Sequence, residues 1–204
     1  MPPLSPFPLS KRLFDIFFGF LFLLLAAPLF ILIALLIFLS EGPPIFVRLE
    51  RISEARSVWI YKFRTMVRDA KAQKPALFHL NERTDGPFFK IRNDPRVTRT
   101  GRILRRFRFD ELPQLINVLH GELSLVGPRP HEPEEVRAYP SQFSAIPHAR
   151  AGLTGASQVA GASSLPFLRE LEFDYDYITH WSFSRDIKIL LRTLAIFLFD
   201  PTAI

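Results

Sequence analysis

The least even feature of the hydropathy pattern is an apolar block near the N-terminus. From Ile16 to Leu39 the chain has no charged residue for 24 positions. As a helix rising about 1.5 Å per residue, this block is long enough to cross a hydrocarbon core of roughly 30 Å. The apolar core of a signal peptide is shorter, about 7–15 residues. The pattern therefore predicts a membrane-associated unit over residues 1–44.

Pro28 lies in the middle of this block, directly after Ala27. Its ring removes one helical hydrogen bond, so we expect the helix to break at Ala27 and Pro28. Basic residues flank the block, with Lys11 and Arg12 before it and Arg48 after it. The positive-inside tendency would place both ends on the cytoplasmic side, as in a re-entrant helix-break-helix hairpin. A spanning helix with a mild proline kink fits these residues equally well.

The remainder of the chain, residues 45–204, alternates between strand-like and helix-like patterns. Its final apolar segment has too few polar residues for a free surface helix, so it should lie against the membrane or in the core. The patterns predict short strands at 45–52 and 58–66, helices at 66–83, 99–108, 110–119, 167–181 and 185–199, and an extended piece at 123–126.

Composition and charge narrow the classes of function. The 204 residues include no Cys, which excludes disulfides, thiolate metal sites and cysteine nucleophiles. Residues 48–108 hold 17 Lys/Arg against 6 Asp/Glu, whereas residues 110–204 hold 7 against 12. A basic segment directly after a membrane block suggests contact with anionic headgroups, phosphorylated substrates or nucleic acid.

Two adjacent carboxylates, Asp110 and Glu111, start the predicted helix at 110–119. Asp110 is suited to the N-cap, and Pro113 falls in the first turn, where its missing N–H costs nothing. The helix dipole favours anions there and would depress the pKa of Asp110. An ionised carboxylate at this point could act as a nucleophile on phosphorus or as a Mg²⁺ ligand. Ordinary helix capping explains the same pair.

Four cations could serve a phosphorylated substrate. The turn Gly127-Pro128-Arg129-Pro130 restricts the backbone around Arg129 and suits a bidentate grip on a phosphate, although an exposed turn would look the same. Lys62 and Arg64 share one face of an extended segment, as they also would on a solvated edge strand. Arg105, five residues before Asp110, could approach the same point.

These motifs together resemble a known family. The bacterial sugar transferases, or monotopic phosphoglycosyl transferases, make polyprenyl-diphosphate-linked sugars, and the similarity covers nearly the whole chain. Beside the Pro28-containing anchor, it rests on the segments KRLFD (11–15), YKFRTM (61–66), NDPRVTRTG (93–101), FDELPQLINVLHGELSLVGPRP (109–130), GLTG (152–155), QVAG (158–161) and FDYDYI (173–178).

The resemblance implies a two-step reaction on a Mg²⁺-bound UDP-sugar with polyprenyl phosphate as acceptor. Asp110 would be the nucleophile and a Mg²⁺ ligand, and Glu111 the acid/base or orienting carboxylate. Lys62, Arg105 and Arg129, with Arg64 as a further candidate, would bind the substrate phosphates.

The family also implies an α+β fold. A small, mainly helical cytosolic catalytic domain over 45–204 and interfacial helices would accompany a re-entrant anchor in the bilayer of the bacterial inner (cytoplasmic) membrane, with the catalytic domain on the cytoplasmic face. The sequence leaves a homo-oligomer open and identifies neither the sugar nor the polyprenol.

The chain departs from the family pattern at several positions. Ala27 stands where a Ser is common, and Ala162 where an Arg commonly follows the Gln-Val-x-Gly motif. If that Arg contacts the donor in relatives, this chain binds its donor differently, uses another cation such as Arg150 or Arg169, or takes an unusual donor. Ala151 replaces a usual Pro, while Leu49 and Ser53 replace a usual Gln and Gly.

The alternative function is a membrane-anchored basic protein that binds nucleic acid or anionic lipid without catalysis. Asp110, Glu111 and the acidic second half adjoin the basic stretch and would repel a polyanion. The aromatic residues in 48–108 also lack the spacing of a base-stacking module. We therefore expect no nucleic-acid partner.

Overall fold

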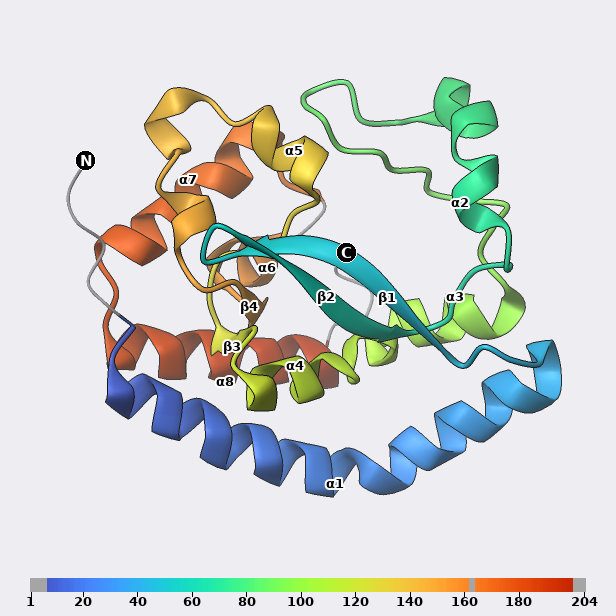
Figure 1. The fold of residues 1–204 in the computed structure, drawn as a ribbon, viewed down its shortest axis with the longest axis horizontal. Helices are drawn as coiled ribbons and strands as arrows, with labels where there is room; N and C mark the ends of the chain where they lie inside the picture. Colours follow the sequence, from blue (N-terminus) through green and yellow to red (C-terminus); the bar gives the residue numbers. More distant parts are fainter. Residues whose placement is uncertain (1–6, 162–163, 200–204) are drawn as a thin grey trace.

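A computed structural model describes residues 7–161 and 164–199 of the chain (Figure 1). It mixes helices and short strands, as the sequence predicted. The strands are β1 (Phe46–Ser53), β2 (Arg56–Phe63), β3 (Ser124–Val126) and β4 (Gly152–Thr154). The helices are α1 (Leu9–Glu41), α2 (Ala70–Gln73), α3 (Arg99–Arg106), α4 (Gln114–His120), α5 (Pro133–Arg137), α6 (Ala156–Ala160), α7 (Phe167–Thr179) and α8 (Phe183–Phe199), with 3-10 turns η1 (Pro75–Leu80), η2 (Phe109–Glu111), η3 (Ser141–Phe143) and η4 (Ile146–His148).

The apolar block forms α1, a single helix of 33 residues that continues through Pro28. Figure 1 shows α1 bending near its middle, so that both ends turn toward the rest of the molecule. The predicted break is therefore a bend inside one helix, because loss of a single backbone hydrogen bond at a proline can bend a helix without ending it. By length and composition α1 could cross a membrane, and only 11% of its most apolar 18-residue stretch is buried.

Charged side chains at the start of α1 attach it to the rest of the chain. Arg12 donates from Nη1 to the carbonyl of Val118 at 2.6 Å and from Nη2 to that of Leu119 at 2.7 Å. These carbonyls lie in the last turn of α4, where helix carbonyls lack the usual donors from a following turn. Lys11 Nζ forms a buried ion pair with Asp186 Oδ2 at 2.6 Å. Lys11 and Arg12, the basic residues from which the membrane topology was predicted, therefore also attach α1 to the rest of the protein.

The hairpin of β1 and β2 confirms the two strands predicted from alternation. The strands are antiparallel, pairing Phe46 with Phe63. Their two-residue turn has φ of 52° at Glu54 and 57° at Ala55, the positive values of a type I′ turn. The Asn117 side chain of α4 holds β2 by accepting from Tyr61 N at 2.9 Å and donating to the Trp59 carbonyl at 2.9 Å. This contact brings β2 beside the segment that carries the acid pair.

A second, parallel sheet joins β3 to β4, where backbone packs directly on backbone. A Cβ atom at Gly152 would lie 2.1 Å from the Gly127 nitrogen, and one at Gly155 would lie 2.1 Å from the Gly127 carbonyl oxygen. Glycine is therefore required for this approach. Around the two sheets lies a core that links β2, α4, β3, α7 and α8, formed by Ile60, Leu115, Val118, Leu123, Leu125, Tyr177 and Ile189.

Two predicted helices differ from the observed elements, and the predicted final helix is observed. The helix predicted at 66–83 is only the short α2 followed by η1, and the helix predicted at 110–119 begins later, as α4 at Gln114. The predicted final helix is α8, whose Asp186 and Ile189 are buried while Leu191 and Leu194 are exposed. One face of α8 thus belongs to the core and the other stays uncovered.

Candidate active site

The acid pair lies in η2, one turn before α4. Arg108 has a left-handed φ of 54°, and Asp110 and Glu111 follow it in a 3-10 turn. Pro113 occupies the N-cap position of α4, so the prediction that Asp110 caps this helix is wrong. The 3-10 turn separates Asp110 from the first α-helical turn, so its carboxylate does not accept the usual capping bond.

Lys62 of β2 binds both carboxylates. Its Nζ donates to Glu111 Oε1 at 2.5 Å and lies 3.9 Å from Asp110 Oδ2. Lys62 therefore lies beside the acid pair, and its predicted part in binding the substrate phosphates stays a prediction. The pairing depends on the Asn117 contact described above, which fixes β2 alongside this segment.

The two carboxylates have opposite pKa shifts. Burial raises the pKa of Asp110 to about 6, with a further rise from Glu111 and opposing effects of Lys62 and Arg105. The depressed pKa predicted for Asp110 is therefore wrong for the metal-free chain, since desolvation outweighs the nearby cations. Burial also acts to raise the pKa of Glu111, but Lys62, Arg129 and Arg108 hold it below its usual range.

The positive charge of Arg105 lowers the pKa of Asp110. Contacts between the motifs at 61–66 and 93–101 hold Arg105 in place. Its Nε donates to Thr65 Oγ1 at 3.0 Å. The Thr65 carbonyl in turn accepts from Thr98 N at 3.0 Å, and Thr98 caps α3 through Gly101 N. A Cβ at Gly101 would lie 2.1 Å from the Thr65 oxygen, so only glycine allows this contact.

Arg129 follows β3 and reaches the same region. Its backbone N–H donates to Asp174 Oδ2 at 2.8 Å, and its Nε lies 3.5 Å from Glu170 Oε1. The side chain is 36% exposed, and its charge helps to lower the pKa of Glu111. The structure therefore brings Lys62, Arg105 and Arg129 around one acid pair, as the sequence predicted.

Arg64 is placed differently. It is buried and donates from Nη2 to the carbonyls of Glu41 at 3.1 Å and Gly42 at 2.7 Å, at the end of α1. Although it lies two residues from Lys62, its guanidinium therefore satisfies the C-terminal carbonyls of a helix. Its predicted part in substrate binding stays a prediction.

Arg150 and Arg169, the two cations considered as substitutes for an Arg at position 162, form ion pairs elsewhere in the structure. Position 162 is outside the described residues. Arg150 forms an ion pair with Glu54 at 2.8 Å, beside the hairpin turn, and Arg169 pairs with Glu172 on the exposed side of α7. Among the described residues, neither forms a hydrogen bond or ion pair with Asp110 or Glu111, so the structure gives no support to either replacement.

Four residues around the site were missed by sequence reasoning. Asn117 and His131 lie in or beside the long motif at 109–130, and Glu170 and Asp174 lie on α7. Asn117 holds β2, Asp174 holds the Arg129 backbone, and Glu170 contacts both Arg129 and His131. Their polar character near a motif was the only available signal, because each acts across a long sequence separation.

The acid pair is suited to a divalent cation. Among the described residues no group of three His, Cys, Asp or Glu side chains could hold a metal. Mg²⁺, however, usually takes one or two carboxylates and completes its shell with water and substrate phosphates. The Asp110 carboxylate lies 3.9 Å from Lys62 Nζ, and Glu111 raises its pKa by like-charge repulsion. A cation between the two carboxylates would relieve that repulsion.

Comparison with known proteins places these features in context. Residues 7–200 match the family model described as bacterial sugar transferase. The chain is 36% identical over 190 residues to the exopolysaccharide production protein ExoY of Rhizobium meliloti, covering 91% of this chain and 84% of that protein. It is 42% identical over 197 residues to the UDP-glucose:undecaprenyl-phosphate glucose-1-phosphate transferase of Caulobacter vibrioides, covering 91% and 68%. It is 35% identical over 192 residues to the undecaprenyl-phosphate galactose phosphotransferase of Salmonella typhimurium, covering 92% and 40%.

Proposed function

Because this chain belongs to the bacterial sugar transferase family, we propose that it transfers a phosphosugar from a UDP-sugar to a membrane polyprenyl phosphate. The products are UMP and a polyprenyl-diphosphate-sugar, and the reaction serves exopolysaccharide or glycoconjugate synthesis. The observation that carries the proposal is the acid pair Asp110-Glu111, held by Lys62 and within the electrostatic reach of Arg105 and Arg129.

The reaction has two displacements at one phosphorus atom. In the first, a carboxylate oxygen of Asp110 attacks the β-phosphorus of the UDP-sugar. A phosphorus–oxygen bond to Asp110 forms, the bond to the bridging oxygen breaks, and its electron pair leaves with UMP. In the second, a phosphate oxygen of polyprenyl phosphate attacks the same phosphorus, and the bond to Asp110 breaks, which regenerates the carboxylate.

The surrounding side chains perform the work that phosphoryl transfer requires, namely positioning and neutralisation of charge. Lys62, Arg105 and Arg129 would bind phosphate oxygens. Glu111, whose pKa is held low, stays ionised and fixes Lys62 beside the nucleophile. With a pKa of about 6, Asp110 is mostly ionised at neutral pH and ready to attack.

Mg²⁺ is part of the proposal. Asp110 and Glu111 would hold it together with the donor diphosphate. When bound, it would supply positive charge that neutralises phosphate oxygens and favours the ionised form of Asp110.

The alternative of a non-catalytic membrane protein gives a clear experimental contrast. The purified chain, supplied with a panel of UDP-sugars, Mg²⁺ and polyprenyl phosphate, is expected to release UMP from at least one donor. Omission of Mg²⁺ is expected to abolish the release. If no donor in the panel yields UMP while the chain still binds anionic vesicles, the binding function would be favoured.

We also propose that α1 is re-entrant. Both of its ends bind the same body: Arg12 contacts the end of α4, and the Glu41 carbonyl accepts from Arg64, which follows β2. A straight spanning helix would place these ends on opposite faces of the bilayer, about 30 Å apart. The bend near Pro28 supports an anchor that enters and leaves on one side, with the catalytic domain on the cytoplasmic face of the inner membrane.

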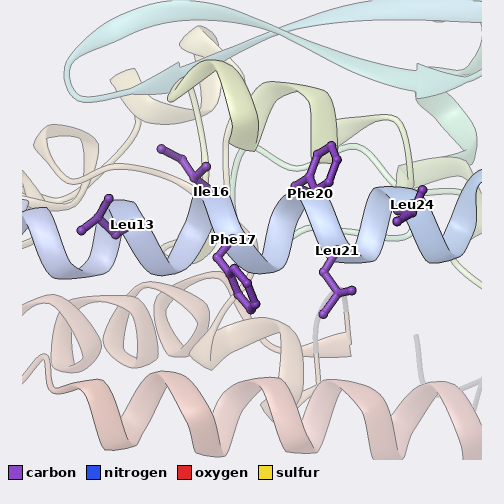
Figure 2. Close-up of a pocket in the computed structure, with 6 residues that line it drawn as sticks. All are labelled: Leu13, Ile16, Phe17, Phe20, Leu21 and Leu24. Carbon is purple, nitrogen blue, oxygen red and sulfur yellow. The ribbon is translucent and has the colours of Figure 1, made fainter.

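The surface next to α1 supports contact with lipid. Figure 2 shows an apolar groove along the N-terminal half of α1, lined by Leu13, Ile16, Phe17, Phe20, Leu21 and Leu24. Phe14 of α1 packs edge-on against Phe183 of α8, with ring centroids 4.8 Å apart. Leu191 and Leu194 are exposed on α8, which would lie at the bilayer interface.

Cysteine labelling tests the topology, since the chain has no native Cys. Ser10 and Ser40 lie near the two ends of α1, and both are exposed. We expect Ser10→Cys and Ser40→Cys to be blocked by a thiol reagent confined to the cytosol and to resist one confined to the periplasm. Periplasmic labelling of Ser10→Cys with cytosolic labelling of Ser40→Cys would instead establish a spanning helix.

A further inference from the structure

The backbone of Arg129 is held by several contacts, but these contacts do not determine the conformation of its long side chain. Pro128 and Pro130 restrict the turn, and the Arg129 N–H donates to the fully buried Asp174 at 2.8 Å. Asp174 also accepts from Ser157 N at 3.3 Å, which ties the turn to α6. None of these contacts restrains the guanidinium, which lies several rotatable bonds away.

Glu170 supplies that restraint. It lies four residues before Asp174 on α7, so both carboxylates project from the same face of the helix. Glu170 is 1% exposed, and its Oε1 lies 2.9 Å from His131 Nε2 and 3.5 Å from Arg129 Nε. Burial acts to raise the pKa of Glu170, but the hydrogen bond with His131 and the charge of Arg129 hold it below its usual range. Glu170 is therefore an anion that His131 holds in place and that in turn contacts Arg129.

His131 sets the position of Glu170. It is 3% exposed, and its Nδ1 shares a hydrogen bond with the Tyr139 hydroxyl. Its ring packs against Phe88, with centroids 5.0 Å apart, and Phe88 packs in turn on Phe167 of α7. A continuous chain of polar contacts thus runs from Tyr139 through His131 and Glu170 to Arg129.

The main effect of these polar contacts is on the geometry of the Arg129 side chain. A buried ion pair adds little net stability, because desolvation offsets the attraction between the charges. Glu170 approaches Arg129 most closely at Nε, and among the described residues neither Nη nitrogen donates a hydrogen bond. The part of the guanidinium that remains open is therefore a pair of adjacent donors, which matches two oxygens of a phosphate group.

We propose that Glu170 is a positioning residue that fixes the guanidinium of Arg129 so that its two Nη nitrogens face the diphosphate of the sugar donor. His131 and Tyr139 hold Glu170 in the required place. The inference rests on the proposed function, because it assumes a nucleoside diphosphate ligand beside Asp110. Glu170 itself is too deeply buried to touch that ligand.

A double-mutant cycle with UDP as the probe tests the proposal. By titration, we expect Glu170→Gln to raise the Kd for UDP about tenfold, and Arg129→Ala to raise it by at least as much. In the Arg129→Ala background, Glu170→Gln should add less than twofold, because there is no guanidinium left to position. Glu172→Gln, an exposed neighbour on α7, serves as the control and should leave the Kd unchanged.

The outcomes separate the inference from the function on which it rests. A wild-type Kd in Glu170→Gln, or an effect of the same size with and without Arg129, would overturn the positioning role. Wild-type chain that binds UDP but releases no UMP from any UDP-sugar would instead overturn the proposed function. If circular dichroism shows that Glu170→Gln is unfolded, Tyr139→Phe replaces it in the cycle. Tyr139→Phe should raise the Kd for UDP about two- to fivefold when Arg129 is present and should have no effect in the Arg129→Ala background. An unchanged Kd with Arg129 present would count against the proposal.

Discussion

Asp110→Asn is expected to abolish UMP release, with a loss of roughly 10⁴-fold or more in turnover. The substitution preserves the size of the side chain but removes the carboxylate that would attack the donor phosphorus in the proposed reaction. Because the first displacement precedes acceptor binding, the wild type should release UMP before polyprenyl phosphate is added, in an amount bounded by the number of enzyme sites. Asp110→Asn should lack this burst as well as steady turnover.

Asp69→Asn is the matched control, since Asp69 is exposed and bonds only Gln73 among the described residues. It should keep wild-type turnover. Mass spectrometry of wild-type enzyme quenched after the burst should show a phosphosugar adduct on the peptide that contains Asp110. Near-normal turnover in Asp110→Asn, or no burst and no adduct in the wild type, would favour direct transfer to the lipid phosphate in a single displacement.

Local patterns of the sequence were sufficient for much of the fold. The alternating character of two segments predicted β1 and β2, and uninterrupted apolar character predicted α1, because both signals depend on residues close in the chain. The helix predicted at 66–83 was largely wrong. Its polar and apolar positions allow a helix, but Pro75 ends α2 and the chain continues as η1.

The members of the site were easier to predict than their physical state. Motif position was enough to choose Asp110, Glu111 and Lys62 as candidates, and the structure places the three side chains together. The pKa of Asp110, however, depends on burial by elements that are far away in sequence, so reasoning from a helix terminus gave the wrong direction. Arg64 shows the same limit, since its contact with the end of α1 can be recognised only once the two segments are packed together.

Buried support for the site was invisible to sequence patterns. Glu170 is separated by 39 residues from His131, and Asn117 by 56 from Tyr61. A Glu on a helix and an Asn inside one are most often surface residues, and only tertiary packing shows that these two are buried and bonded. Such residues decide where the cations of the site point, which is why motif matching alone does not describe the geometry.

Lys62→Met is expected to lower turnover at pH 7 by roughly 10²- to 10³-fold and to change its pH dependence. Lys62 lowers the pKa of both Asp110 and Glu111, because a nearby cation favours the charged form of a carboxylate. Without it, both pKa values rise. The pKa of Asp110 starts at about 6, so at pH 7 a larger fraction of the nucleophile would be protonated and inactive.

The pH–rate profile of the first half-reaction separates this effect from simple loss of a phosphate contact. In the wild type, with Mg²⁺ present, UMP release should fall as the pH drops through the pKa of Asp110, which bound Mg²⁺ would move below about 6. In Lys62→Met the fall should move to higher pH, and part of the lost rate should return as the pH is raised. Lys62→Arg keeps the cation and should retain the wild-type acid limb, while Lys71→Met, at an exposed position in α2, should behave as wild type. If the rate of Lys62→Met falls at the same pH as that of the wild type, Lys62 acts on the substrate alone and not through the ionisation of Asp110.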